Sequence, residues 1–251
     1  MKPNFDLSGR TAIVTGANTG IGQAIAVSLA SAGAAVLGVG RSSMAETEGQ
    51  IADVGGRFAS FSADLSTIEP VDAIVDAAVG AFGSVDILVN NAGIIRRADA
   101  IDFTEADWDA VMDVNLKTAF FLSQAVAKRM IPNGRGKIIN IASMLSFQGG
   151  IRIPSYTASK SGLAGLTRLL ACEWAGKGIN VNAIAPGYFV TNNTTALRED
   201  AKRSSDILVR IPAGRWGDPQ ELGGAAVFLA SDAAAYVHGT ILPVDGGWLA
   251  R

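Results

Sequence analysis

The sequence predicts a single α/β domain over residues 1–251, with a doubly wound sheet of seven parallel strands and helices on both faces of the sheet. Three observations lead to this prediction. Strand-like and helical patterns alternate along the chain, several strand-like runs are apolar on both faces, and no proline-rich linker, low-complexity segment or internal repeat divides the sequence. Strands that alternate with helices over short connections form parallel sheets with right-handed crossovers.

The strands are predicted where short apolar runs lie between polar or glycine-rich turns. These runs cover residues 11–15, 35–39, 57–63, 87–89, 137–141, 180–183 and 240–244. Helical spacing of apolar residues follows in the gaps, at residues 21–32, 70–81, 108–130 and 155–175. The least regular segment, residues 191–212, comes after the sixth strand, and its polar start and mixed charges predict a mobile lid over a binding cleft.

Composition and charge exclude several classes of protein. The hydrophobic fraction of 49% is sufficient for a large core, and the net charge of −2 argues against nucleic acid or a membrane surface as the main partner. No signal core opens the chain and no uncharged stretch could span a bilayer, so we expect a cytoplasmic protein. Cys172 and His238 are the only residues of their kinds, which argues against a metal site and a Ser-His-Asp relay. We expect Cys172 to pack as an apolar residue.

A glycine-rich turn, residues 15–22, follows the first strand and opens the first helix. Its glycines have the spacing Gly-x-x-x-Gly-x-Gly, which allows the backbone to approach a pyrophosphate at a helix N-terminus. Such turns are common in a chain with 29 glycines, but the position between a strand and a helix points to a dinucleotide. The cofactor contacts predicted in this turn are Gly16, Asn18, Thr19, Gly20 and Ile21.

Two further positions concern the adenosine half of the dinucleotide. An acidic residue usually follows the second strand and binds the ribose hydroxyls of NAD, but here Arg41 follows it. Arg41 favours NADP(H), whose 2′-phosphate it could bind; a solvated arginine or one stacked on adenine fits nearly as well, and NAD(H) stays open. Asp64 and Leu65 follow the third strand, where Asp64 either accepts a hydrogen bond from adenine or caps a helix.

Polar residues also follow the fourth and fifth strands, at Asn91 and Ser143, and Tyr156 and Lys160 share one face of the next helix. A neighbouring ammonium favours the phenolate and would move the pKa of a tyrosine from about 10 towards neutrality, so that Tyr156 could act as a general base. Ser143 could hydrogen-bond the substrate oxygen, and Asn115 could hold a water that links Lys160 to solvent.

Each of these features has an ordinary alternative. Tyrosine and lysine occur four residues apart by chance on many helices, and Asn115 could bond to the backbone of its own helix. The ordered set is more informative, because its members lie near the carboxyl ends of successive strands. Ligands bind at that edge of open α/β sheets, so the set predicts an active site.

With these motifs in this order, the sequence resembles the short-chain dehydrogenase/reductase family over essentially its full length, which implies a Rossmann-like fold. The resemblance implies that Tyr156 is the catalytic acid/base, Ser143 polarises the substrate oxygen, Lys160 binds the nicotinamide ribose and lowers the tyrosine pKa, and Asn115 supports a proton relay. It also implies a homotetramer. Further cofactor contacts implied by the resemblance, besides Tyr156 and Lys160, are Asn91, Ala92, Gly93, Pro186, Gly187, Phe189 and Thr191.

A branch of the family that acts on sugar acids of the gluconate type is similar to this sequence at residues 146–152, 186–188, 191–194, 210–217 and 244–251. A sugar acid needs a cation for its carboxylate and polar donors for its hydroxyls. Arg152 is the leading candidate for the carboxylate, because its loop joins Ser143 to Tyr156, and Arg96 is the second. Either arginine could instead be solvated or face another subunit. The candidate hydroxyl contacts are Gln148 and Asn193.

Three functions therefore stay open from the sequence. The first is a sugar-acid dehydrogenase that uses NADP(H) or NAD(H). The second is the same chemistry on another ketone or alcohol, such as a 3-oxoacyl thioester or a small cyclic alcohol. The third is a non-catalytic protein that senses a dinucleotide, because fold does not fix function. The intact set of Asn115, Ser143, Tyr156 and Lys160 disfavours the third.

Overall fold

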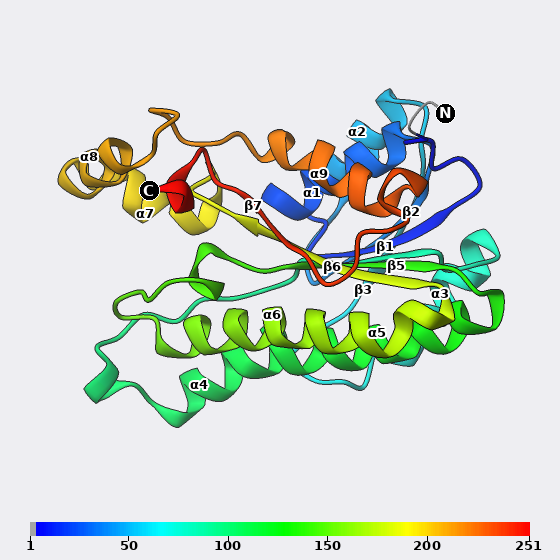
Figure 1. Cartoon of the computed structure of the whole chain (residues 1–251), viewed down its shortest axis with the longest axis horizontal. Coiled ribbons are helices and arrows are strands. Elements are labelled where there is room, and N and C mark those ends of the chain that lie inside the picture. Colours follow the sequence, from blue (N-terminus) through cyan, green and yellow to red (C-terminus); the bar gives the residue numbers. More distant parts are fainter. Residues whose placement is uncertain (1–3) are drawn as a thin grey trace.

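Seven parallel strands form one sheet in residues 4–251, the part of the chain that the computed structural model describes (Figure 1). The strand order is β3-β2-β1-β4-β5-β6-β7, so the direction of winding reverses between β1 and β4. The seven-stranded, doubly wound sheet is as predicted. The strands are β1 (Thr11–Thr15), β2 (Ala35–Gly40), β3 (Arg57–Ser62), β4 (Ile87–Asn90), β5 (Gly136–Ile141), β6 (Ile179–Pro186) and β7 (Ile241–Val244).

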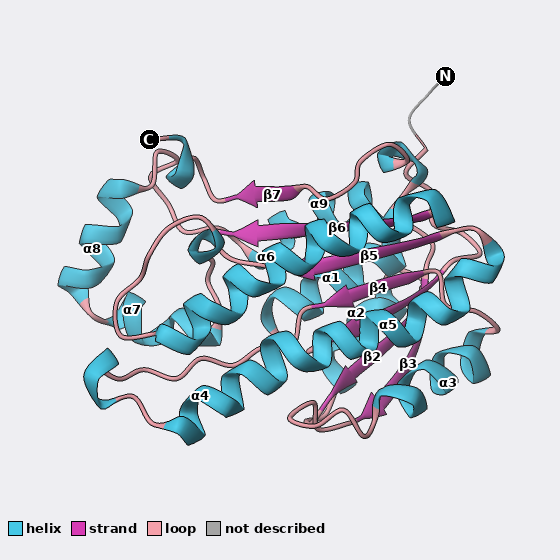
Figure 2. Cartoon of the chain, turned by 60° about the horizontal axis from the view of Figure 1, so that its bottom comes forward, coloured by secondary structure: helices cyan, strands magenta, loops and turns pink. Residues whose placement is uncertain are grey.

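Helices cover both faces of this sheet (Figures 1 and 2). Successive side chains of β1 show why: Ala12 and Val14 pack beneath α1 and α9, whereas Ile13 between them packs against α3, α5 and α6. Alternate side chains of this one strand thus contribute to both layers of the core, one on each face of the sheet. The helices are α1 (Gly20–Ser31), α2 (Ala45–Asp53), α3 (Val71–Phe82), α4 (Glu105–Met112), α5 (Thr118–Met130), α6 (Pro154–Trp174), α7 (Thr195–Glu199), α8 (Ala201–Arg210) and α9 (Gly223–Ala230).

The structure corrects two expectations. The helix predicted over residues 108–130 is interrupted, because a single π-helical turn (Asp113–Lys117) separates α4 from α5. Such turns often mark functional sites, and this one contains Asn115. Cys172 is exposed on α6 rather than packed in the core, because it lies outside the buried stripe of that helix.

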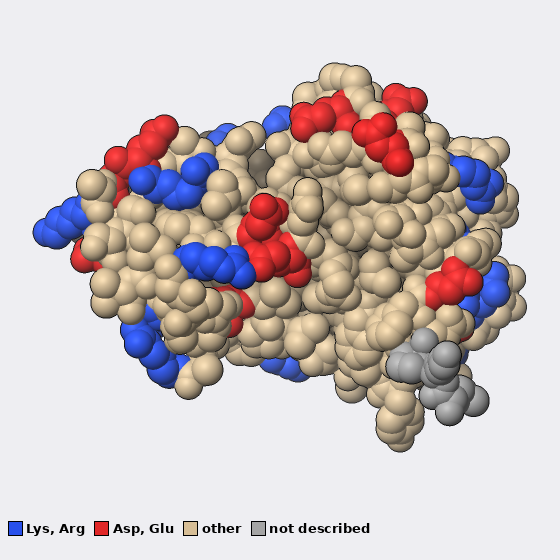
Figure 3. All heavy atoms as spheres, turned by 90° about the horizontal axis from the view of Figure 1, so that it is seen from above, with Lys and Arg blue, Asp and Glu red and all other residues tan. Residues whose placement is uncertain are grey.

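The segment at residues 191–212 folds as α7 and α8 and projects from the end of the sheet to which β4 to β7 point (Figure 2). On the face that carries α1, α2 and α9, Lys and Arg occur in separate groups among Asp, Glu and uncharged side chains (Figure 3). None of the helices in residues 4–251 combines the length and apolarity that a bilayer span requires.

Candidate active site

The predicted site residues meet at the carboxyl ends of β1, β4, β5 and β6, where the winding of the sheet reverses. β1 leads into the glycine-rich turn, β4 into Asn91, and β5 into Ser143. α6 crosses the same edge with its first turns and brings Tyr156 and Lys160 there. Its buried stripe, which packs the helix on the sheet, continues to its N-terminal end and includes Ser159 and Lys160.

The glycine-rich turn is packed so closely that it has little room for side chains, and a ligand can approach its backbone. Gly16 and Gly20 have φ values of 67° and 58°, in the left-handed region. A Cβ at Gly22 would overlap the carbonyl oxygen of Gly16 and the side-chain amide of Asn91. In the described chain no side chain caps the start of α1, and the first turn of this helix carries no acidic residue. Its free N–H groups and positive dipole end fit a pyrophosphate.

Asn91 fixes this turn against β4. Its side-chain amide donates to the carbonyl oxygen of Thr15 (2.8 Å), and its backbone N–H donates to the hydroxyl of Thr15 (3.0 Å). The same hydroxyl accepts from the N–H of Ala92 (3.0 Å). Thr191 starts the segment after β6, and its methyl carbon would lie 3.6 Å from a Cβ at Gly20. The glycine-rich turn therefore lies against both the end of β4 and the start of the predicted lid.

The part of the site that is predicted to bind the adenosine half of the dinucleotide is more open. Arg41 is exposed, and its charge contributes to a lowered pKa of Asp64, after the larger effect of hydrogen bonds from Ser66. Asp64 accepts from the N–H of Ser66 (3.0 Å) in a turn where no helix begins. Leu65 is buried, and its carbonyl oxygen accepts from the hydroxyl of Thr118 (3.0 Å). Arg41 and Asp64 thus present charge at the ends of β2 and β3, while Leu65 belongs to the core.

At the end of β6, Gly187 must be glycine, because a Cβ would lie 2.6 Å from the Cα of Asp245. Its N–H donates to the carbonyl oxygen of Val244 (2.9 Å), which ties the strand end to β7. Pro186 closes the strand, and Phe189 is buried in the core layer beneath α1. Pro186 and Gly187 therefore lie at the site edge, whereas Phe189 packs into the core.

Lys160 is buried, and its ammonium lies 5.7 Å from the centre of the Tyr156 ring. It donates a hydrogen bond to the carbonyl oxygen of Ile141 at the end of β5 (2.6 Å). Burial lowers the pKa of Lys160 to about 8. The cation is therefore held beside the tyrosine at the edge of the sheet.

Tyr156 is half-buried, and burial around its hydroxyl raises its pKa above the usual 10.0. Contact with the Ser143 hydroxyl and, to a smaller degree, the charge of Arg97 act in the opposite direction. The prediction that Lys160 brings this pKa towards neutrality is wrong for this structure, because burial disfavours the phenolate more than its neighbours favour it. At neutral pH, Tyr156 therefore carries its proton.

Asn115 bonds to a different segment from the one expected. Its Oδ1 accepts from the N–H of Ile94 (2.8 Å), and its amide donates to the carbonyl oxygen of Ile94 (3.0 Å) and to the hydroxyl of Ser159 (3.3 Å). A Cβ at Gly93 would lie 3.3 Å from Asn115 Oδ1 and 3.7 Å from Lys160 Nζ. Asn115 therefore holds the segment after β4, which contains Gly93 and Ile94, next to Lys160. A proton relay through a water bound to Asn115 stays a prediction.

A buried polar network behind the site escaped the sequence analysis. The amide of Asn90 donates to Asn140 Oδ1 and to the hydroxyl of Ser123, each at 2.9 Å. The amide of Asn140 donates in turn to the hydroxyl of Thr167 (2.9 Å). These bonds join β4, β5, α5 and α6. The signal available in the sequence was an asparagine in each of two buried strands, at the end of β4 and within β5, because buried amides need partners.

The predicted carboxylate partners are both engaged by exposed acids. Arg152, with a φ of 63°, pairs through its Nε with Asp99 (3.1 Å), and Arg96 pairs with Asp107 (3.2 Å). The arginine whose charge reaches Tyr156 is the neighbour, Arg97. The candidate named from the sequence was Arg96 and not the adjacent Arg97.

Arg97 also joins the site to the predicted lid. Its guanidinium donates to the carbonyl oxygen of Asn193 (3.3 Å). Gln148 faces the other end of this region, where its Oε1 accepts from Trp248 Nε1 (3.1 Å) and from Arg210 on α8 (3.3 Å). Arg210 lies over the ring of Trp248 at 4.0 Å. Gln148 therefore binds Trp248 and α8, a set of contacts near the C-terminus that sequence reasoning did not identify.

The sequence matches the family model described as enoyl-(acyl carrier protein) reductase over residues 16–249. The 2-dehydro-3-deoxy-D-gluconate 5-dehydrogenase of Escherichia coli (strain K12) is 60% identical over 248 residues, which cover 98% of this chain and 98% of that protein.

Solved structures of proteins described as gluconate-type dehydrogenases are also similar to this chain. A structure described as a 2-deoxy-D-gluconate 3-dehydrogenase of Agrobacterium tumefaciens, with bound NADP, has a TM-score of 0.94 and 62% identity, with 100% of both chains covered. The gluconate 5-dehydrogenase of Burkholderia cenocepacia J2315, in complex with NADP and tartrate, has a TM-score of 0.93 and 43% identity, with 99% of this chain and 98% of that one covered. Both of these similar proteins were crystallised with NADP.

Proposed function

The chain belongs to the short-chain dehydrogenase/reductase family, and we propose that it interconverts a secondary alcohol and a ketone on a gluconate-type sugar acid with NADP(H). The observation that carries the proposal is the meeting of Ser143, Tyr156 and Lys160 at one point, with the cation of Arg97 acting on the same tyrosine. A binding protein without chemistry would not need this arrangement of proton-transfer groups.

The dinucleotide would be held by the glycine-rich turn, by Asn91, Ala92 and Gly93, and by the end of β6. Arg41 is exposed at the end of β2, where it can pair with a 2′-phosphate, which supports NADP(H) over NAD(H). When bound, the nicotinamide supplies or accepts the hydride.

The chain's own residues handle the substrate oxygen and its proton. Ser143 donates a hydrogen bond to this oxygen, and Tyr156 gives it a proton in reduction or removes one in oxidation. Because the pKa of Tyr156 is raised, its protonated form dominates at neutral pH and suits reduction, whereas oxidation should accelerate as pH rises. Asn115 keeps Ile94 and Ser159 in place around this group.

For the substrate carboxylate we propose Arg97, because its charge reaches the hydroxyl of Tyr156. Arg152 and Arg96 each pair with an aspartate through Nε, which leaves them as the weaker candidates. Residues 191–212 would serve as the lid, since Arg97 already contacts Asn193 within it. A homotetramer is also part of the proposal, supported by exposed Trp108 on α4 and Leu169 on α6.

Turnover measured by the absorbance of NADPH, with 2-dehydro-3-deoxygluconate, gluconate, neutral polyols and a 3-oxoacyl thioester, tests this function. We expect turnover of an acid and none of the polyols. Activity on the thioester alone would show that the substrate class is wrong, although the chemistry would stand.

Arg97→Met should lower kcat/KM for the acid at least tenfold, because a charge-assisted bidentate contact is lost. Arg152→Met is the matched control and should change kcat/KM little. Should the control variant instead show the loss, the carboxylate would belong to Arg152.

A further inference from the structure

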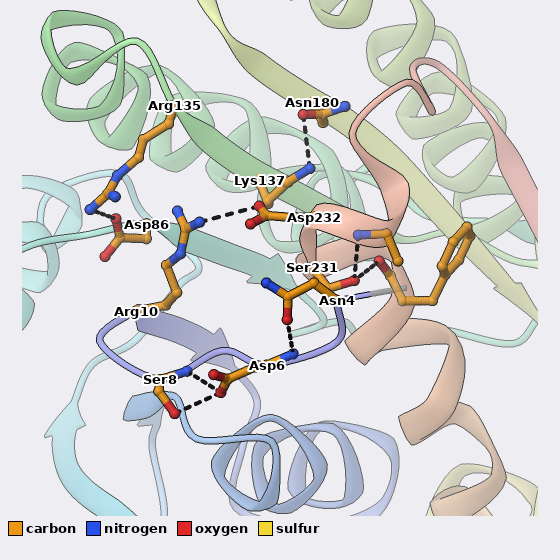
Figure 4. Close-up of polar contacts among 12 residues, drawn as sticks. Asn4, Asp6, Ser8, Arg10, Asp86, Arg135, Lys137, Asn180, Ser231 and Asp232 are labelled. Carbon is orange, nitrogen blue, oxygen red and sulfur yellow. Dashed lines mark hydrogen bonds and ion pairs between the residues drawn. The ribbon is translucent and has the colours of Figure 1, made fainter. Parts of the chain in front are cut away.

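A polar pocket of about 230 Å³ lies at the amino ends of β5 and β6, at the opposite edge of the sheet from Tyr156. Three cations line it: Arg10 before β1, Arg135 before β5, and Lys137 within β5. Figure 4 shows that these side chains come from separate segments and that each one contacts a different partner: Asp232 for Arg10, Asp86 for Arg135 and Asn180 for Lys137. The proposed proton transfer does not involve this pocket, because Ser143, Tyr156 and Lys160 lie at the edge formed by the carboxyl ends of the strands.

Lys137 is the central feature of the pocket. The residue is 9% exposed, and among residues 4–251 its ammonium has one hydrogen-bond partner, Asn180 Oδ1 on the neighbouring strand (3.0 Å; Figure 4). An ammonium has three donors, so two stay available towards the pocket. No carboxylate of the described residues forms an ion pair with Lys137, although buried charges are ordinarily paired.

The acids near the pocket are committed to other partners. Asp232 pairs with Arg10 (3.2 Å), and both side chains are partly exposed. Asp86 is buried and accepts from the N–H of Thr11 (3.0 Å), the hydroxyl of Ser84 (2.7 Å) and the guanidinium of Arg135 (3.1 Å). Each arginine therefore keeps further N–H donors.

Positive charge exceeds negative charge in the pocket lining, where three cations accompany the single carboxylate of Asp232. Burial lowers the pKa of Lys137, and while Asp232 opposes this effect, Arg10 adds to it. A bound anion would remove the deficit of negative charge and satisfy the open donors at once.

We propose that Arg10, Arg135 and Lys137 form a binding site for a small oxyanion of the phosphate class. A tetrahedral phosphate accepts donors from several directions, which matches cations that arrive from three segments, whereas a planar carboxylate is best matched by one guanidinium. The pocket volume suits inorganic phosphate or the phosphate group of a small ester.

Titration calorimetry with inorganic phosphate tests this site in protein saturated with NADP, so that phosphate cannot bind to the dinucleotide site instead. We expect one phosphate per chain. Lys137→Met should weaken the affinity at least tenfold, because it removes the unpaired ammonium. Ala235→Asp places a carboxylate in the pocket from an exposed position and should weaken it similarly without removing a buried group.

Tyr236→Asp is the matched control: it adds the same charge one residue away, at a side chain that is 98% exposed and does not line the pocket. It should leave the affinity unchanged within twofold. The proposal would be overturned if wild-type protein bound no phosphate, if the pocket variants bound it as well as wild type, or if malonate bound more tightly than phosphate. The same titration with glycerol 3-phosphate distinguishes the two sources of phosphate. Tighter binding of glycerol 3-phosphate would indicate a phosphate ester, and tighter binding of inorganic phosphate would indicate the free ion.

Discussion

Replacing Lys160 by methionine should make the protein more stable and abolish its turnover. Burial lowers the pKa of Lys160 from 10.5 to about 8, which means that folding opposes the charged ammonium. The fall corresponds to about 3 kcal/mol of unfavourable free energy at neutral pH. Methionine fills a similar volume without the charge. It also loses the hydrogen bond to Ile141, worth about 1 kcal/mol, so the net gain should be about 2 kcal/mol.

The sign of the pH dependence follows from the same shift. Below about pH 8 both folded and unfolded chains carry the proton on Lys160; between about pH 8 and 10.5 only the unfolded chain does. The free energy of unfolding of the wild type should therefore rise with pH across this window, and the part of the rise that comes from Lys160 should be absent in Lys160→Met.

Urea unfolding at one fixed protein concentration, near neutral pH and near the upper end of the window, measures both effects. Lys128→Met, at an exposed position of α5, is the control and should behave as wild type. A variant less stable than wild type at neutral pH, with the rise intact, would show that Lys160 is not held as a costly buried cation. Its turnover should be lost in either case.

Two further substitutions test the surroundings of the site. Gly22→Ala should weaken NADP binding more than tenfold in titration calorimetry, because its Cβ overlaps the Gly16 carbonyl oxygen and the Asn91 amide, whereas Gly49→Ala in open space should not; equal affinities would refute the close-packed turn. Asn115→Leu should cost about 2–3 kcal/mol of unfolding free energy, since both backbone groups of Ile94 lose their partner, and should lower kcat; the exposed Asn133→Leu should do neither, and an unchanged kcat in Asn115→Leu would limit Asn115 to a structural role.

The sheet could be predicted because its signal is local. Residues 11–15, for example, are buried on both faces of the sheet. A strand that helices cover on both faces has a continuous apolar run instead of an alternating pattern, and such a run can be recognised in the sequence. The Tyr156–Lys160 spacing was equally readable, since it depends only on one helical turn. The π turn at Asn115 was not, because its extra residue is stabilised by the contact with Ile94, 21 positions earlier in the chain.

Two further expectations depended on side-chain surroundings that form only on folding. Arg152 and Arg96 were predicted as carboxylate partners, in that order, but Asp99 and Asp107 pair with them once the chain is folded. The pKa of Tyr156 was predicted from one neighbouring cation, whereas burial, which no local pattern reports, decides its direction.

The hydroxyl of Tyr156 is the group that we propose moves the proton. Tyr156→Phe removes this one oxygen atom, and Tyr236→Phe removes the same atom from a side chain that is 98% exposed. With the sugar acid and NADP, we expect kcat of Tyr156→Phe to fall by about 10²–10⁴-fold while NADP affinity stays within twofold of wild type, and we expect Tyr236→Phe to be unchanged. Turnover of Tyr156→Phe near the wild-type rate, with NADP still bound, would show that another group moves the proton.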